Sequence, residues 1–251
     1  MQTTNTVLAR PTATRAAATS VAAWGPAQPA WDEVRAQADR ISEAMTMVAA
    51  QVPLQRRVVR AGDTVVRAGD AFTHLHIINA GCVKIVNSAA DGRAQMVGLQ
   101  FKGDWLGLDG IAEGRYRCDA VALDTGEVWS LRYDVLLAAC ARHAPLMNLL
   151  HAEMSRVISR DRDALLSLNT LSADARVSEF LCQTADAMAR RGLRTDQITL
   201  RLTRAEIGNY LGMTLESVSR ALSRLARERV ISFADGARRE IRITDIRALL
   251  H

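Results

Sequence analysis

The sequence predicts an α+β fold built from three consecutive parts: a small all-β barrel or jelly roll, a long helix, and a C-terminal winged helix-turn-helix. Short β-rich runs separated by glycine turns fill residues 54–132. An apolar repeat of helical spacing follows, and two capped amphipathic helices with a hairpin end the chain. Strands grouped before helices, rather than alternating with them, are typical of α+β proteins. We therefore divide the chain into a leader (1–50), a β-roll (51–135), a helix region (136–170) and a winged helix-turn-helix region (171–251).

The leader is rich in Ala, Thr, Pro and Arg. It lacks the compact apolar core and cleavage pattern of a signal or transit peptide. We therefore expect a partly disordered leader in which residues 31–50 form a first helix. Apolar runs along the chain are too short to span a bilayer, so we expect a cytoplasmic protein with no membrane partner.

Residues 54–132 alternate between strand-forming runs and turns. The turns fall at glycines such as Gly62, Gly69, Gly92 and Gly103. Many short strands punctuated in this way predict a closed barrel or a jelly roll. The predicted strands lie at 57–60, 64–66, 75–78, 83–86 and 95–99.

The stretch from about Pro145 to Asn169 predicts one long helix with an apolar stripe. The stripe consists of Met147, Leu150, Met154, Val157, Ala164 and Leu168, with Asp161 at a position that calls for an apolar residue. This three-four alternation is typical of a coiled-coil seam and predicts a homodimer. A helix packed only on its own β-roll remains the alternative. Two facing Asp161 carboxylates would repel each other, so we hypothesise that Asp161 tunes the strength of the dimer.

Residues 202–233 predict two short helices joined by a tight turn. Thr203 and Glu206 have the spacing of a capping box at the start of the first helix. Gly212 suits the turn, and Thr214 caps the second helix. That helix is expected to bury Leu215, Val218, Leu222 and Leu225 and to expose Glu216, Ser217, Ser219, Arg220 and Ser223. The pattern indicates a helix-turn-helix whose second helix would enter a DNA major groove.

A basic hairpin follows this motif. The apolar runs 230–233 and 241–243 flank Asp235-Gly236, which is a strong hairpin signal, and Arg238 and Arg239 lie just beyond the turn. Residues 171–251 contain 14 Arg against 10 Asp and Glu, so most of the net charge of +5 lies here. An excess of cations beside a helix-turn-helix favours binding to DNA phosphates.

These residues resemble the Crp/Fnr transcription regulators, and 203–225 (TRAEIGNYLGMTLESVSRALSRL) resemble the Fnr branch most. The resemblance implies a cyclic-nucleotide-binding-type β-roll, a long dimerisation helix and a winged helix-turn-helix. It implies that Glu216, Ser219 and Arg220 read a TTGAT-type half-site; we add Thr214 and Ser217 to this surface. It further implies RNA polymerase as a partner, touched by the loop that holds Asp109, and a response to oxygen, redox state or nitrogen oxides.

The known effectors of this family fit the chain poorly. Fnr holds its iron–sulfur cluster through closely spaced N-terminal cysteines. Here the cysteines are Cys82, Cys118, Cys140 and Cys182, without ligand spacing, so no cluster is expected. A redox role for Cys182 stays open. In this absence of N-terminal cysteines the chain resembles regulators of the FixK type, which bind DNA without a cofactor.

Cyclic AMP and haem are the other two effectors to compare. Leu108 stands where the Crp pocket has its ribose-binding carboxylate, and Cys118 follows Arg117 in place of a hydroxyl residue. His74 and His76 lie two apart on a predicted strand, as paired haem ligands would. We predict no cofactor, and keep as the alternative a regulator gated by haem or a cyclic nucleotide in the β-roll. No phosphate loop, nucleophile elbow or metal-ligand cluster occurs, so we expect no enzyme.

Overall fold

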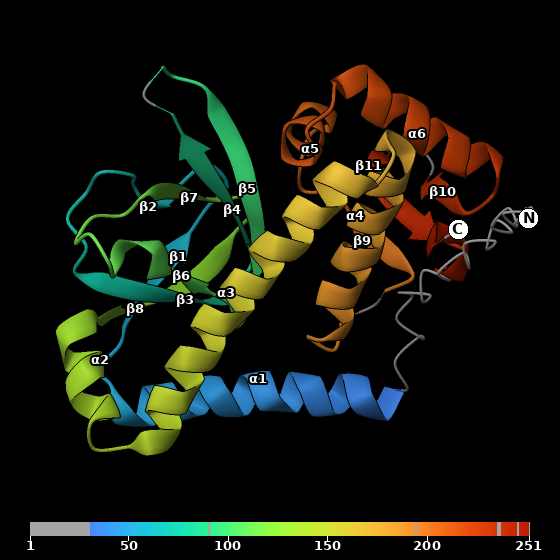
Figure 1. The fold of residues 1–251 in the computed structure, drawn as a ribbon. Coiled ribbons are helices and arrows are strands. Elements are labelled where there is room, and N and C mark those ends of the chain that lie inside the picture. Colours follow the sequence, from blue (N-terminus) through green and yellow to red (C-terminus); the bar gives the residue numbers. More distant parts are fainter. Residues whose placement is uncertain (1–30, 90, 194, 235–236, 245, 251) are drawn as a thin grey trace, which may run out of the picture.

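The computed structural model describes residues 31–89, 91–193, 195–234, 237–244 and 246–250. The first 30 residues of the predicted leader and the Asp235-Gly236 turn lie outside the described residues. The predicted α+β fold is confirmed (Figure 1). None of the helices in the described part of the chain combines the length and apolar character needed to cross a bilayer.

The β-roll consists of two antiparallel four-stranded sheets, ordered β1-β8-β3-β6 and β2-β7-β4-β5. The strands are β1 (Gln55–Val59), β2 (Thr64–Val66), β3 (His74–Ala80), β4 (Cys82–Ser88), β5 (Ala94–Phe101), β6 (Trp105–Leu106), β7 (Cys118–Ala122) and β8 (Gly126–Arg132), with a short 3-10 helix at Leu108–Gly110. All five predicted strands are confirmed, as β1 to β5. β6, β7 and β8 were not among them. Ile78, Val83 and Ala120 come from both sheets and pack together inside the roll.

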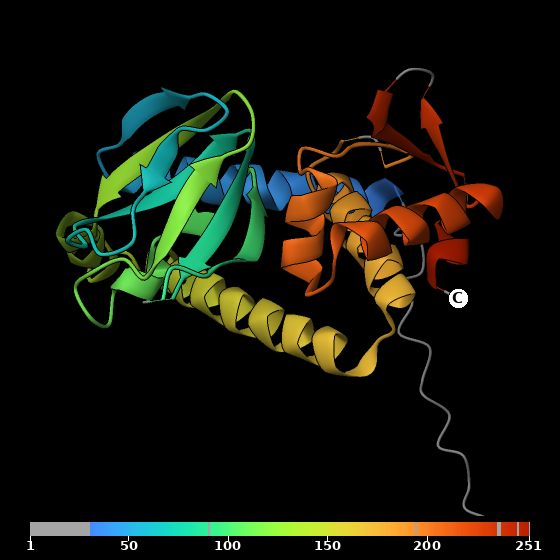
Figure 2. The same cartoon turned by 90° about the horizontal axis from the view of Figure 1, so that it is seen from above.

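Three helices cover the outer face of one sheet: α1 (Trp31–Gln51), α2 (Tyr133–Cys140) and α3 (Ala144–Thr170). A helix therefore occupies the stretch 31–50, as expected. Val48 of α1, Leu136 of α2 and Leu146 of α3 pack against Leu75 and other residues of the sheet. The predicted helix at 145–169 is confirmed as α3. Viewed from above, α3 runs along both the β-roll and the C-terminal region (Figure 2).

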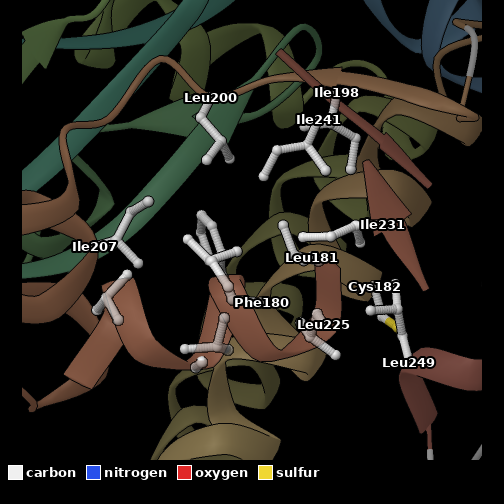
Figure 3. Close-up of a cluster of buried hydrophobic side chains, with 14 of the residues drawn as sticks. Phe180, Leu181, Cys182, Ile198, Leu200, Ile207, Leu225, Ile231, Ile241 and Leu249 are labelled. Atoms are coloured by element: carbon white, nitrogen blue, oxygen red, sulfur yellow. The ribbon is translucent and has the colours of Figure 1, made fainter. Parts of the chain in front are cut away.

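The C-terminal region has its own core, drawn in Figure 3. Its elements are α4 (Ala173–Ala189), β9 (Gln197–Thr199), α5 (Arg204–Leu211), α6 (Leu215–Arg227), β10 (Ile231–Ala234), β11 (Ala237–Ile243) and a 3-10 helix at Arg247–Leu250. Leu181 of α4, Leu222 of α6 and Ile241 of β11 are all at most 1% exposed. β11 lies between β10 and β9, which confirms the predicted hairpin.

Local signals form the helix-turn-helix as predicted. Thr203 and Glu206 make a full capping box at the start of α5. Gly212 ends α5 with a φ of 61°, in the left-handed region that favours glycine. Thr214 caps α6 by accepting a hydrogen bond from the Ser217 amide. One detail was wrong: Leu215 is 46% exposed. Leu215 is the first residue of α6 and lies outside the C-terminal core, whereas Val218, one turn later, is buried in it.

Candidate nucleic-acid interface

The exposed face of α6 carries the side chains predicted to read DNA. Glu216 and Arg220 are exposed, as is Thr214, and Ser217 and Ser219 are half-buried. The buried face of the helix holds Val218, Ala221, Leu222 and Leu225. Because core packing fixes that face, the rotation of α6 and the direction of its polar side are fixed too.

Hydrogen bonds at the start of α6 order this polar face. The Thr214 hydroxyl lies 3.2 Å from the Ser217 hydroxyl and accepts from its amide at the same distance. Arg220 Nη2 donates to Ser217 Oγ at 3.2 Å. Thr214 and Ser217 therefore hold the guanidinium of Arg220 beside the first turn of the helix. We assign these two residues a positioning role in addition to the predicted contact with DNA.

Glu216 and Arg220 carry opposite charges on this face. A hydrogen bond from its own backbone amide, then one from Thr214, holds the pKa of Glu216 below its ordinary value. Its carboxylate is therefore ionised at neutral pH and accepts hydrogen bonds. A carboxylate can accept from a cytosine amino group, and a guanidinium can donate to guanine O6 and N7. This pair can discriminate between base pairs.

The β10–β11 hairpin, which follows α6 in the sequence, supplies further cations. Arg239 and Arg242 are exposed on β11, whereas the side chain of Arg238 lies outside the described residues. The register pairs Ile231 with Ile243 and Phe233 with Ile241, so apolar residues of both strands share one face. This arrangement suits a wing that contacts phosphates through its arginines.

The first helix of the motif, α5, is bound to the β-roll. Asn209 Nδ2 donates to the Ala94 carbonyl at 2.9 Å, and its Oδ1 accepts from the Met96 amide at 2.6 Å. Lys84 Nζ pairs with Glu206 Oε1 at 2.5 Å. The side chain of Met96 is buried in the C-terminal core. These contacts were not predicted, because no local pattern relates residues more than 110 positions apart.

The apolar stripe on α3 differs from the predicted one. Leu150 is only 3% exposed and packs with Met147 against the β-roll. Leu150 therefore offers no free surface, whereas Met147 is half-buried. This corrects the predicted seam at Leu150, where the alternative of packing on the β-roll holds. Farther along α3, Ile158, Leu165 and Leu166 are 50–62% exposed. They were missed because only the strict three-four alternation was followed.

The remaining predicted seam residues are at least partly accessible. Met154 and Leu168 are exposed, and Val157 is half-buried. Asp161 is exposed, and partial burial raises its pKa against the opposing effect of Arg160.

The predicted sensor residues lie in two places in the β-roll. Arg117 is exposed and pairs with Glu113 at 2.8 Å, and its amide donates to Asp109 Oδ2 at 3.1 Å. Asp109 itself is exposed. The His74 and His76 rings stack with centroids 6.3 Å apart. Burial, followed by the nearby charges of His74 and Arg57, lowers the pKa of His76 to about 4.

The cysteines lie in environments that suppress their reactivity. Burial raises the pKa of Cys82, Cys118 and Cys182 to about 12. Cys182 is 5% exposed inside the C-terminal core (Figure 3). Oxidation requires a thiolate and access, and Cys182 has neither in this arrangement. Within the described ranges, no group of three or more His, Cys, Asp or Glu side chains is placed to hold a metal ion.

Comparison with known proteins identifies the family. A model of the cyclic nucleotide-binding domain matches residues 56–143, and a model of the Crp-like helix-turn-helix domain matches residues 175–251. The transcriptional regulatory protein Btr of Bordetella pertussis is 31% identical over 195 residues, which cover 78% of this chain and 79% of Btr. The chain belongs to the Crp/Fnr family of transcription regulators.

Two further relatives support this assignment. The fumarate and nitrate reduction regulatory protein of Escherichia coli is 30% identical over 178 residues, 71% of each chain. The structure of FixK2 from Bradyrhizobium japonicum is similar with a TM-score of 0.70 and 25% identity, covering 79% of this chain and 96% of FixK2. This family regulates transcription through a DNA-binding helix-turn-helix and is not enzymatic.

Proposed function

We propose that this Crp/Fnr regulator belongs to the Fnr branch and binds a two-fold symmetric DNA site with TTGAT-type half-sites. The observation that carries the proposal is the exposed face of α6, where ionised Glu216 and Arg220 lie one helical turn apart beside Ser219. These side chains match, position by position, those that the resemblance assigns to half-site reading. Arg239 on the wing would contact the neighbouring phosphates.

The wild-type protein tests this proposal directly. Fluorescence anisotropy with a labelled TTGAT palindrome and with a scrambled duplex gives both affinities at one salt concentration. We expect the palindrome to bind at least about 1,000-fold more tightly, as specific sites generally do. Equal affinity for both duplexes, with no effector added and with the protein folded, would falsify this site assignment.

A homodimer through α3 would join two such half-sites. Ile158, Leu165 and Leu168 place large apolar side chains on one face of α3. A clustered apolar surface is typical of an interface. A two-fold dimer would hold two copies of α6 about one DNA turn apart, as palindromic sites require.

Asp161 lies within this surface, and we propose that it weakens the dimer. Two carboxylates brought together by the two-fold axis would repel each other. Asp161→Ala is therefore expected to lower the dimer dissociation constant in analytical sedimentation. Asp91→Ala, on the exposed β4–β5 turn, is the control and should leave that constant unchanged. An unchanged constant for Asp161→Ala would show that Asp161 has no such role.

For the signal, we propose a cytoplasmic response to oxygen, redox state or nitrogen oxides without an iron–sulfur cluster, and contact with RNA polymerase through Asp109. The scattered cysteines with raised pKa values support the absence of a cluster. Absorption spectra and intact-mass spectrometry of protein purified without oxygen test this. A Soret band or a bound cyclic mononucleotide would instead support the alternative, a regulator gated by haem or a cyclic nucleotide in the β-roll.

A further inference from the structure

A cavity of about 700 Å³ lies where the β-roll meets the C-terminal region. Its walls come mainly from α1, the loop between β5 and β6, the middle of α3 and the C-terminal half of α4. The volume falls in the range typical of small-molecule sites. Gly107, Leu108 and Arg117 are absent from its walls, so it is separate from the place where the family resemblance puts a cyclic nucleotide.

The walls of the cavity carry an excess of positive charge. Six cationic side chains line it, against three carboxylates. The cations are Arg40, Lys102, Arg156, Arg160, Arg190 and Arg191, and the carboxylates are Asp104, Glu153 and Asp163. They come from four separate elements, so the charge results from the tertiary fold and not from one basic helix.

The ion pairs in the cavity leave this excess uncompensated. Glu153 pairs with Arg156. Asp104 is shared between Arg191 at 2.9 Å and Arg160 at 3.4 Å. Burial lowers the pKa of Arg191, Asp104 opposes that change, and the nearby charges of Arg190 and Arg160 lower the pKa further. Arg190 and Arg160 therefore destabilise the charged form of Arg191, and an anion among the three would be stabilised.

Arg160 also has an unmet hydrogen-bonding group. Its Nη1 donates to Gln100 Oε1 at 2.7 Å. Its Nη2 is buried and makes no hydrogen bond among the described residues. A buried donor without an acceptor costs free energy. A bound oxyanion would supply the acceptor after a rotation of the Arg160 side chain that brings Nη2 to the cavity surface.

We propose that this cavity binds an organic phosphate of nucleotide size. Planar guanidiniums form paired, charge-assisted hydrogen bonds to phosphate oxygens. Phe101, Ile41 and Leu149 add apolar wall surface for an attached base or other organic group. Residues 1–30 do not supply this anion, because they contain no Asp or Glu.

Binding here would link the two halves of the molecule. Arg160 belongs to α3, Arg191 follows α4, and Lys102 follows β5, so one phosphate group could contact elements on both sides of the cavity. A ligand that prefers this arrangement shifts the population toward it. Any resulting change in DNA affinity rests on the proposed function, whereas ligand binding does not.

Isothermal titration calorimetry of the full-length protein tests the proposal. The probes are inorganic pyrophosphate, ADP, GDP and cyclic di-GMP, each titrated at low and at physiological salt. We expect at least one nucleotide to bind with Kd below about 100 µM, more tightly than pyrophosphate and more weakly as salt rises. The double variant Arg160→Gln/Arg190→Gln should weaken it at least about tenfold.

Matched controls distinguish binding in the cavity from nonspecific attraction of an anion to a basic protein. Arg93→Gln/Arg142→Gln removes two exposed arginines outside the cavity and should leave the nucleotide affinity unchanged. If the cavity double variant fails to fold, as judged by its thermal unfolding, the two single variants take its place. No binding of any probe at about 5 mM, or an equal loss in both double variants, overturns the proposal. Pyrophosphate binding as tight as that of every nucleotide overturns the assigned ligand size.

DNA binding measured on the same samples keeps the two proposals apart. A protein that binds the palindrome but no phosphate compound refutes only the cavity. A protein that binds the nucleotide but not the palindrome refutes only the DNA site.

Discussion

The two helices of the helix-turn-helix use their polar sides differently. On α6, the hydrogen bonds of Thr214, Ser217 and Arg220 stay within the first turns of the helix. On α5, Glu206 and Asn209 reach across to the β-roll. The helix that would read DNA is thus left accessible, while its neighbour is attached to the sensor domain.

The contrast between α5 and α6 indicates where a signal would enter the DNA-binding region. α5 and α6 share one core through Ile207 and Leu222, so they move together. A change at β5 would shift α5 and reorient α6 without touching any DNA-reading side chain. Substitutions on α6 should therefore alter the base preference. Substitutions on α5 should instead alter the strength of the contact between the β-roll and the C-terminal region.

The largest expected effect comes from Arg220→Ala. Losing a guanidinium that pairs with guanine should cost about 1–3 kcal/mol of binding to the palindrome and relax specificity at that guanine. Because Arg220 is exposed, the thermal unfolding temperature should not change. Anisotropy titrations against palindromes altered at single positions measure this, with Ser223→Ala on the same helix as the control. Equal affinity of mutant and wild type would refute the role of Arg220.

Asn209→Ala should give the opposite pattern. It removes two hydrogen bonds to β5, and the cost should be about 1 kcal/mol of the free energy of unfolding. Deuterium exchange at the Met96 amide should speed up, because that amide loses its acceptor on Asn209. The ranking of altered palindromes should stay as in wild type. Unchanged protection of Met96 would mean that α5 is not held to β5 in solution, and the contrast with α6 would be lost.

Much of the fold could be predicted because its signals are short-range. The capping box of Thr203 and Glu206 and the turn at Gly212 depend on residues within a few positions of each other. The same holds for the strands at 75–78 and 83–86, where glycines mark the ends. The exposed reading residues of α6 followed from the helical period and from the resemblance.

The rest depends on contacts between distant residues. Leu150 was placed on a dimer seam because period alone cannot tell whether a stripe faces a partner or its own β-roll. The pairing of Lys84 with Glu206 joins residues 122 positions apart, and the cavity brings together four elements. Leu215 fits the apolar period but lies beyond the core. A local sequence pattern identifies the apolar face of a helix, but it does not identify the element or subunit that packs against that face.

The attachment of α5 should depend on pH. Burial would raise the pKa of Glu206, but hydrogen bonds from Lys84 and Thr203 outweigh this effect and hold the pKa below its ordinary value. Because the folded pKa lies below the unfolded one, the stabilisation is present above about pH 4.5 and is lost as pH falls through the folded value.

Glu206→Gln should therefore destabilise the protein at about pH 6 by less than about 1 kcal/mol, and the difference from wild type should shrink toward pH 3.5. Urea unfolding at both pH values measures it. Glu113→Gln, which alters an exposed ion pair with Arg117, should have little effect at either pH. A pH-independent loss in Glu206→Gln would exclude the carboxylate charge as its cause.

The smallest expected effect concerns the wing, whose contribution to sequence specificity should differ from that of α6. Arg239→Ala removes an exposed cation from β11, and a phosphate contact carries no base information. Affinity should fall about equally for the palindrome and for scrambled DNA, and the slope of log K against log salt should flatten by about one. Arg142→Ala, an exposed arginine beside the β-roll, should leave the slope unchanged. If Arg239→Ala instead changed the base preference, the division between a reading helix and a wing that contacts only the backbone would be wrong, because the wing would then contribute to sequence recognition.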